Sequence, residues 1–399
     1  MPAARLEIAL RSGVPDTRGH SVREQARRLL HLPLRACRTR EVYLIDFTLT
    51  VAERRALRAA FTDPVTARAA YDRLPPPPCD WVLEIGFKPG VTDNVGRTAR
   101  ALTADVLDRQ PAPGEEVFTA TQYFLSGPGL ERDQVLRLAS EVLANPLIQT
   151  MRCWRRAEWL AAPVDRTPPR FTETPEITAR TIPLDGGDAA LERISAEGIL
   201  SLSLTEMHAI RDHYLDPARR AGRAAAGLPP WPTDVELECL AQSWSEHCCH
   251  KIFAARVRYT DSEGRTALID SLFKTYIQGA TRAAQRDWLV SVFTDNAGIV
   301  RFNERLYLTY KCETHNSPSA LDPYGGAITG IVGVNRDPLG TGLGSALLCN
   351  TWGYCLGSPF YYGDLPAGLM HPRRIRSGVH QGVIDGGNQS GIPYARGFE

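Results

Sequence analysis

The first 165 residues contain an internal repeat. The segment Gly13–Gly19 (GVPDTRG) recurs as Gly90–Gly96 (GVTDNVG), 77 residues further along the chain. Each copy follows a short apolar stretch typical of a β-strand and precedes a stretch with the apolar spacing of a helix. A second strand and a second helix follow at matching positions in both copies. The pattern predicts two tandem βαβα units that form a paired α+β module.

The repeat also indicates where its elements lie. We interpret the glycine–aspartate turn as a tight strand-to-helix connection, because Gly and Asp are common turn residues. The prolines of Pro75–Pro78 separate the two copies as a stiff spacer. No cluster of His, Cys and carboxylate falls within the copies, so we predict a structural or regulatory role for them. The expected strands are 6–10, 42–47, 81–85 and 120–124, and the expected helices are 22–30, 51–61, 98–107 and 131–143.

The whole-chain composition limits the class of protein. The chain has 399 residues, 43% of them hydrophobic and 23% charged, which is ordinary for a soluble globular protein of about two to four domains. A formal net charge of +1 gives no general attraction to nucleic acid or membrane. No segment has the apolar length of a membrane span or signal peptide, and the nine cysteines are scattered without a C-x-x-C pair. We therefore expect a cytoplasmic protein with reduced thiols and no nucleic-acid or membrane partner.

The remainder of the chain reads first as loop and helix, then as strands. Residues 166–185 contain Thr-Pro steps typical of a loop, and two helices are expected at 204–215 and 234–249. Beyond residue 251 the apolar pattern changes to that of strands. The expected strands are 253–259, 288–293, 298–302 and 306–312.

The first candidate site is the segment 243–251, SWSEHCCHK. His247 and His250 are three residues apart, so they share one face if the helix continues through them. Zinc binding is disfavoured, because the adjacent Cys248 and Cys249 point to different sides and no second ligand pair at zinc spacing follows. Chance histidines at a polar helix end would explain one histidine better than two beside a glutamate and a lysine.

The second candidate site is the run 311–342. In a strand, Lys311 and Glu313 would share a face, which suits a nucleotide phosphate and its Mg²⁺ better than a surface ion pair. His315 would lie where the strand ends and could serve as a general base. Three glycines at 325, 326 and 330 would let backbone amides approach an anion. Arg336 offers a guanidinium for a phosphate, and Asp337 offers a second metal carboxylate.

Two familiar nucleotide-binding motifs are missing from the sequence. There is neither a Walker G-x-x-x-x-G-K-[ST] sequence nor a G-x-G-x-x-G between a strand and a helix, which disfavours P-loop and Rossmann sites. A third segment, 385–393 (DGGNQSGIP), is by itself only a weak turn-rich signal.

Taken in order, these segments resemble the phosphoribosylformylglycinamidine synthase family. The resemblance is carried by 245–251, 313–319, 325–330, 336–337 and 387–393, and it covers nearly the whole chain. It implies residues 1–78 and 79–165 as two copies of the small accessory subunit, 166–240 as a partly helical linker, and 241–399 as the ATP-binding domain. The implied fold of this last part is the first α/β domain of an aminoimidazole ribonucleotide synthetase.

The resemblance also implies an activity. ATP would activate the amide of formylglycinamide ribonucleotide as an iminophosphate, and glutamine-derived ammonia would displace phosphate in this step of de novo purine biosynthesis. By motif match, it implies catalytic roles for His247 and His315, ATP contacts for His250 and Lys311, Mg²⁺ ligands at Glu313 and Asp337, and substrate contacts for Thr314, His315, Asn316, Ser317 and Arg336.

The sequence departs from the family in two respects. Ser317 stands where many members have a second histidine, and His250 stands where many have tyrosine. The second synthetase half and a glutaminase do not follow within 399 residues, so we expect a fragment, or a protein that receives the other synthetase half and ammonia from partners. The alternatives are a non-catalytic nucleotide-binding or scaffold module, or another ATP-using member of the superfamily such as a small-molecule kinase.

Overall fold

The computed structural model describes residues 3–171, 178–366 and 368–399 and divides into two compact units. The first unit comprises Met1–Thr172, Asp295–Gly298 and Thr309–Glu399, and the second comprises Glu173–Thr294 and Ile299–Leu308. Of the loop expected at 166–185, residues 172–177 lie outside the described part. Over the described ranges, no helix has the length and apolarity that crossing a membrane requires.

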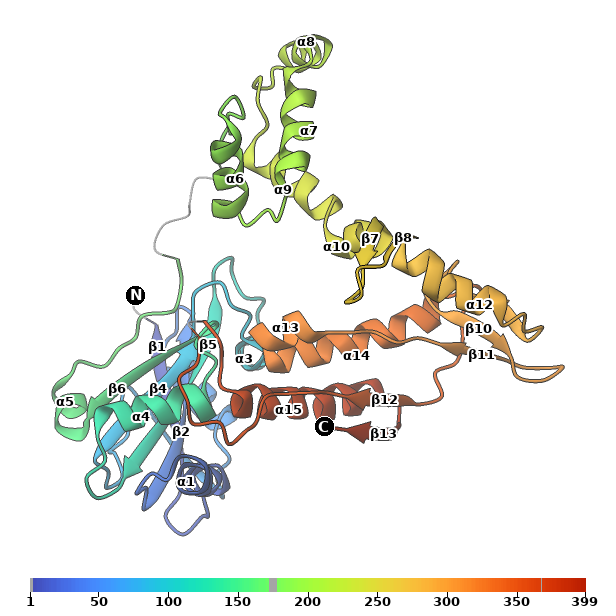
Figure 1. Ribbon diagram of the computed structural model, residues 1–399. Helices are drawn as coiled ribbons and strands as arrows, with labels where there is room; N and C mark the ends of the chain where they lie inside the picture. Colours follow the sequence, from blue (N-terminus) through green and yellow to red (C-terminus); the bar gives the residue numbers. More distant parts are fainter. Residues whose placement is uncertain (1–2, 172–177, 367) are drawn as a thin grey trace. The chain divides into compact units, whose positions relative to one another are not determined.

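The two repeats build one antiparallel sheet of six strands, in the order β3-β1-β2-β5-β4-β6 (Figure 1). β2 and β5 pair over their full length in the centre, from Ala36 opposite Ser126 to Asp46 opposite Glu116, and so join the copies. The elements are β1 (Ala4–Leu10), α1 (Thr17–Leu30), β2 (Ala36–Asp46), α2 (Val51–Ala60) and β3 (Ala67–Tyr71), then β4 (Trp81–Phe87), α3 (Asn94–Leu107), β5 (Glu116–Ser126), α4 (Arg132–Leu138), η1 (Ala139–Leu143) and β6 (Gln149–Arg155).

The predicted repeat is therefore confirmed, with one strand more in each copy than expected. The third strands, β3 and β6, follow the Asp63-Pro64 and Asn145-Pro146 steps. β3 reads Ala-Arg-Ala-Ala-Tyr, and alanine and arginine are not typical strand formers, so its sequence carries little β signal. Each copy is thus a βαβαβ unit.

The glycine–aspartate turn is confirmed as a strand-to-helix connection. Asp16 is the N-cap of α1: its carboxylate accepts hydrogen bonds from Gly19 N at 2.7 Å and from Thr39 N at 2.6 Å. Asp93 caps α3 in the same way, with Gly96 N at 2.7 Å and Thr119 N at 2.6 Å. Each aspartate thus satisfies a free helix amide and ties the helix to the neighbouring strand.

The two faces of the sheet differ in chemistry. Alternation in β1 places Leu6 and Ile8 against an apolar core shared with the helices, and Arg5 and Glu7 on the other face. That second face is buried too, partly beneath Trp159 of α5 (Arg156–Ala161). Its charges form a network of Arg5, Arg40 and Arg152 with Glu7, Glu84 and Asp165, in which each guanidinium contacts at least one carboxylate.

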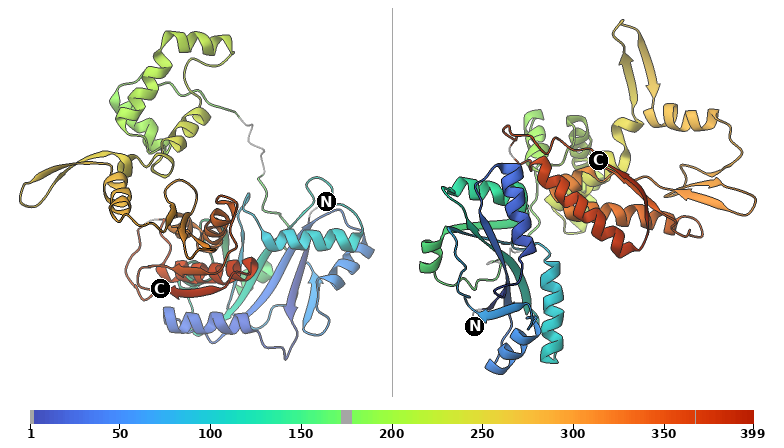
Figure 2. Two further views of the ribbon diagram at one scale, coloured as in Figure 1. Left: turned by 90° about the vertical axis from the view of Figure 1, so that its right-hand side faces the viewer. Right: turned by 90° about the horizontal axis from the view of Figure 1, so that it is seen from below.

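The first unit is completed by a helical layer from the C-terminal part of the chain (Figure 2). Its elements are α13 (Asn316–Leu321), α14 (Pro323–Gly340), β12 (Asn350–Gly353), α15 (Pro372–Ser390) and β13 (Tyr394–Phe398), with β12 parallel to β13. α14 packs on α15 through Ala327, Ile331, Val379 and Val383. The layer is joined to the second repeat by Arg373, whose guanidinium lies 3.1 Å from the Glu141 carboxylate.

The second unit contains the helices and strands between these parts. Its helical core gathers Leu191, Met207, Ile210 and Leu237, and the helix expected at 204–215 is confirmed as α7. β7 and β8 form an antiparallel hairpin, and β9 pairs antiparallel with β10. The elements are α6 (Asp188–Glu197), α7 (Leu204–Leu215), α8 (Pro217–Ala225), α9 (Asp234–Ser243), α10 (Glu246–Cys249), α11 (Lys251–Ala254), β7 (Arg256–Thr260), β8 (Thr266–Asp270), η2 (Phe273–Gln278), α12 (Gly279–Ala283), β9 (Leu289–Ser291), β10 (Gly298–Arg301) and β11 (Tyr307–Tyr310), the last two reaching the boundary between the units.

Candidate functional site

The segment 311–319 runs antiparallel along one face of α14. This face carries Gly326, Gly330, Gly333 and Asp337, spaced by four, three and four residues, which is the spacing of one side of a helix. A Cβ atom at each glycine would meet this segment: 2.5 Å from Ser319 N for Gly326, 3.1 Å from His315 Cβ for Gly330, and 2.4 Å from Glu313 Oε2 for Gly333. The glycines therefore make room for the segment.

This arrangement corrects two expectations. β11 ends at Tyr310, so Lys311 and Glu313 do not share the face of a strand. Residues 325–330 are not a loop that cradles an anion but part of the 18-residue helix α14. Residues 385–393 likewise end a helix, α15, with Gly391 in the left-handed conformation after it. Close packing explains the first two glycines of this segment, since a Cβ at Gly386 would lie 2.8 Å from Ile331 Cδ1 and one at Gly387 would lie 2.4 Å from Tyr394 Cε2.

Two residues with predicted binding roles, Lys311 and Asp337, form an ion pair at the end of this face. Lys311 Nζ lies 2.7 Å from Asp337 Oδ2, and both side chains are largely shielded from solvent. Arg336 points away, with 75% of its side chain exposed, and its Nε is 3.9 Å from Asp337 Oδ1. The structure thus brings a lysine and a carboxylate together while leaving the neighbouring guanidinium open to solvent.

Glu313 and His315 lie further along the same segment, beside Gly333 and Gly330 of α14. Lys311, Glu313, His315 and Asp337 are called the α14 cluster below. Glu313 is exposed, and within the described residues its carboxylate has no hydrogen-bond or ion-pair partner. His315 is partly buried, and its Nδ1 atom is fully buried without a partner in the described part of the chain. Thr314, Asn316 and Ser317 surround them as exposed residues at the start of α13. The exposed Glu313 carboxylate is therefore open to a ligand, whereas the His315 Nδ1 atom is closed off from solvent.

A first prediction tests the glycine face. Gly326→Ala is expected to lower the free energy of unfolding by about 1–3 kcal/mol, because its Cβ would collide with backbone atoms of Pro318 and Ser319 that cannot rotate away. The matched control is Gly340→Ala in the same helix, where a Cβ meets nothing within 4 Å and alanine has the better helix propensity. Native-state hydrogen exchange of α14 peptides in both variants checks this, and equal opening free energies would contradict it.

The other candidate segment, 243–251, belongs to the second unit. The helix expected at 234–249 ends at Ser243, and Trp244 and Ser245 separate it from the short helix α10. His250 follows α10 in the left-handed conformation, φ 51°, so a helix does not continue through both histidines. The expectation that His247 and His250 share a helix face is therefore wrong.

Local hydrogen bonds hold this bend. Glu246 accepts from Ile252 N at 2.9 Å and from Phe253 N at 3.2 Å, and these bonds lower the pKa of its carboxyl group. Lys251 Nζ is 2.9 Å from a Glu206 carboxylate oxygen on α7. With Glu246 and Lys251 engaged, His247 is exposed and projects from the short helix. Phe253, expected in a strand, lies in α11 instead.

The α14 cluster contains side chains of the kinds that contact phosphate and Mg²⁺, without a full set of protein metal ligands. Nowhere in the described residues do three or more His, Cys, Asp or Glu side chains gather as a metal cluster. Mg²⁺ does not require such a cluster, since it binds through one or two carboxylates, waters and substrate phosphates. In the α14 cluster, Glu313 and Asp337 are carboxylates and Lys311 is a cation, which are the side-chain types that such a site uses.

Comparison with known proteins finds two family models and a set of similar enzymes. Residues 191–251 match the family model of the formylglycinamide ribonucleotide amidotransferase linker domain, and residues 294–398 match that of the AIR synthase related protein, N-terminal domain. The chain is a relative of the phosphoribosylformylglycinamidine synthases. It is 35% identical over 223 residues to the "Phosphoribosylformylglycinamidine synthase subunit PurL" of Thermoplasma acidophilum, covering 55% of this chain and 24% of that protein.

Other synthases show the same coverage. The Thermoplasma volcanium subunit PurL is 32% identical over 217 residues, with 53% of this chain and 24% of that protein covered. The synthase of Drosophila melanogaster is 32% identical over 240 residues, with 54% and 17% covered. The chain thus spans about a quarter or less of the length of these synthases, and about half of its own residues align.

The sequence analysis did not single out Gly333, which lies beside the α14 cluster. The Glu313 carboxylate occupies the position that a Cβ of residue 333 would take, so a glycine is needed there for Glu313 to lie where it does. The signal that could have found it is the helical spacing of Gly326, Gly330 and Gly333, which becomes informative only when the segment is recognised as a helix rather than a loop.

Proposed function

We propose that the chain supplies the ATP-binding part of a phosphoribosylformylglycinamidine synthase. Its reaction is the ATP-dependent conversion of formylglycinamide ribonucleotide and glutamine-derived ammonia to formylglycinamidine ribonucleotide, ADP and phosphate. The observation that carries the proposal is the α14 cluster: Lys311, Glu313 and His315 are on the 311–319 segment, which lies along the α14 face that carries Asp337. The relatives, named as synthases of this kind, support it.

Each residue of the α14 cluster has a separate proposed role in phosphoryl transfer. Glu313 and Asp337 would hold Mg²⁺, which when bound neutralises charge on the phosphates and on the transferring group. Lys311, now paired with Asp337, would turn to an ATP phosphate, and Arg336, which is exposed, would reach the substrate. His315 would accept the proton released as ammonia attacks, while Thr314, Asn316 and Ser317 position the substrate at the start of α13.

The second unit contributes the remaining proposed residues. His247, exposed on α10, would act as the other catalytic histidine, and His250 would contact ATP. We propose residues 1–78 and 79–165 as accessory-subunit-like repeats, 166–240 as the linker and 241–399 as the synthetase domain. The proposed partners are a glutaminase that delivers ammonia and the remaining synthetase half, in the cytoplasm.

One assay tests the function. ADP release is measured from the purified chain with ammonium and Mg·ATP, with and without formylglycinamide ribonucleotide, alone and with added partner fractions. We expect release to depend on the ribonucleotide and to fall at least tenfold in Glu313→Gln, because one Mg²⁺ carboxylate is lost. Glu304→Gln is the matched control, because Glu304 is exposed and is not part of the α14 cluster.

The outcomes separate the alternatives. Nucleotide binding without turnover under every condition would favour a non-catalytic module. ADP release that ignores the ribonucleotide would favour another ATP-using enzyme of the superfamily. Equal activity of Glu313→Gln and Glu304→Gln would show that the α14 cluster does not take part in the reaction.

A further inference from the structure

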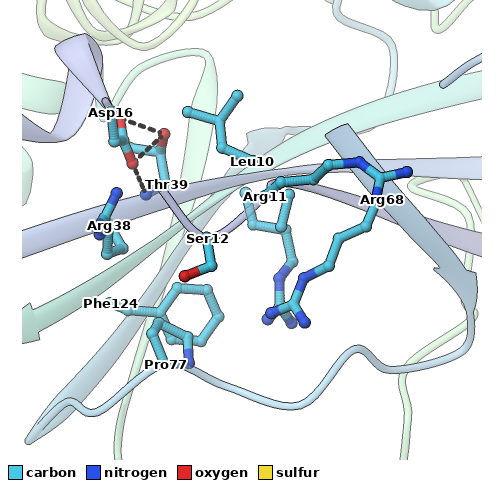
Figure 3. Close-up of a pocket in the computed structure, with 11 residues that line it drawn as sticks. Leu10, Arg11, Ser12, Asp16, Arg38, Thr39, Arg68, Pro77 and Phe124 are labelled. Carbon is cyan, nitrogen blue, oxygen red and sulfur yellow. Dashed lines mark hydrogen bonds between the residues drawn. The ribbon is translucent and has the colours of Figure 1, made fainter. Parts of the chain in front are cut away.

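A pocket with several arginines in its lining lies on the first repeat, away from α14. It has a volume of about 170 Å³ and is lined by strand residues and by Pro77 of the spacer (Figure 3). Ala9 of β1 is opposite Arg40 of β2 on one side and opposite Arg68 of β3 on the other, so both arginines stand on the same face with a small residue between them. Because Ala9 has a small side chain, the pocket opens between the side chains of Arg40 and Arg68.

The pocket has more positive than negative charge. Its lining includes Arg11, Arg38, Arg40 and Arg68 but a single carboxylate, Asp16, which is already engaged by Gly19 and Thr39. Within the described residues, Arg11, Arg38 and Arg68 have no carboxylate partner, although Arg11 Nε donates to the Ala67 carbonyl at 2.9 Å.

Arg40 adds an unmet hydrogen-bond donor. It is only 2% exposed and its Nη1 is paired with Glu7 at 2.6 Å, but its Nε has no partner in the part of the chain that is described. Burial, together with the charges of Arg68 and Arg5, lowers the pKa of Arg40 despite the pairing with Glu7. An anion in the pocket would reduce the repulsion between the two positive charges and could accept a hydrogen bond from the buried donor.

The second repeat provides an internal comparison. The row Arg40–Ala9–Arg68 corresponds to Ala120–Gly86–Thr150, because Gly86 is opposite those two residues in β5 and β6. Both guanidinium groups are thus absent where the backbone is the same. Arg40 is accounted for by its bonds to Glu7 and to the Leu74 and Pro75 carbonyls. Arg68 makes no such bonds among the described residues, so its presence in the first copy calls for a separate explanation.

We propose that this pocket binds a phosphate group, either inorganic phosphate or the end of a phosphate monoester. Guanidinium groups match the tetrahedral oxygens of phosphate with paired N–H donors, and Ser12 adds an exposed hydroxyl at the rim. This pocket is separate from the α14 cluster, and phosphate binding there is not a step of the proposed synthase reaction. Phosphate binding can therefore be measured without turnover.

Arginine footprinting tests the proposal on the full chain. Phenylglyoxal modification of each arginine is followed by peptide mass spectrometry, with inorganic phosphate, ribose 5-phosphate or sodium chloride at matched ionic strength. We expect at least one phosphate compound, but not chloride, to slow modification of Arg38 and Arg68. Arg58, exposed on α2 and outside the pocket, should be unaffected. Protection by inorganic phosphate identifies the free ion, and protection by the sugar phosphate alone identifies a monoester.

A variant pair completes the test. Arg68→Thr installs the residue found at the equivalent Thr150 and keeps a good strand former, so the sheet should fold. It is expected to weaken protection of Arg38 about tenfold, the value of one charge-assisted hydrogen bond, while Arg58→Gln leaves it unchanged. The proposal is overturned if neither phosphate compound protects the pocket, or if both variants behave alike.

Discussion

Glu7→Gln is expected to lower the free energy of unfolding of the N-terminal sheet by about 3–5 kcal/mol. The Glu7 carboxylate, 1% exposed, accepts from Arg5 at 3.1 Å, from Arg40 at 2.6 Å and from Leu74 N at 2.8 Å. Among the described residues it is the one carboxylate that contacts Arg40. Its removal leaves a buried guanidinium uncompensated, and a buried charge without a partner costs far more than a well-formed pair contributes.

The measurement must report on the sheet, because a chain with more than one unit does not unfold in a single step. Native-state hydrogen exchange of peptides from β2 and β5 gives the opening free energy of the central strand pair. Glu41→Gln is the matched control, since Glu41 is exposed on β2 and its loss should change stability by less than about 0.5 kcal/mol. If both variants exchange alike, the network does not hold the sheet.

A double variant separates the buried charge from the lost packing. Glu7→Gln with Arg40→Met removes both members of the pair and replaces the guanidinium with an apolar side chain of similar length. We expect it to recover much of the stability lost in Glu7→Gln, because buried ion pairs replaced by apolar groups are often close to neutral. A further loss would show that the hydrogen bonds from Arg40 to the spacer carbonyls of Leu74 and Pro75 matter more than its charge.

The N-terminal sheet was predictable from the sequence because the same turn occurs twice. Asp16 and Asp93 each have local partners, so their role as strand-to-helix turns follows from the residues themselves. The charged face of the sheet was not predictable in this way. Arg5 and Glu84 are 79 residues apart, and only the pairing of the two copies brings them within 2.6 Å.

In the candidate site, the residues were easier to predict than their secondary structure. Glycine usually marks loops and turns, so the run around Gly330 reads as a loop when considered alone. In the structure it is a helix because tertiary packing against the 311–319 segment and α15 offsets the low helix propensity of glycine. The bend at Trp244 was missed for a related reason: apolar spacing continues through it, and a new helix starts where the Ser245 hydroxyl accepts a hydrogen bond from Cys248 N.

His315→Ala is expected to lower kcat for formylglycinamidine ribonucleotide formation by about 10²–10⁴-fold while nucleotide binding stays within a few fold, if His315 is the proposed proton acceptor. The ring is held by its position before α13 and by close contact with α14, where the Gly330 Cβ position lies 3.1 Å from His315 Cβ and 3.3 Å from Cγ. Its buried Nδ1 has no hydrogen-bond partner in the described residues, so no hydrogen bond from that atom holds the fold.

Two further variants decide between a chemical and a structural role. Gly330→Ala should displace the ring without removing it, giving a smaller loss of kcat that a positioning defect would explain. His20→Ala, an exposed histidine on α1, controls for loss of an imidazole elsewhere and should be unchanged. The measurements are product formation at saturating substrate and Mg·ADP affinity by calorimetry. A loss of nucleotide affinity that accounts for the whole effect would make His315 a binding residue, and full activity of His315→Ala would assign proton acceptance to another group.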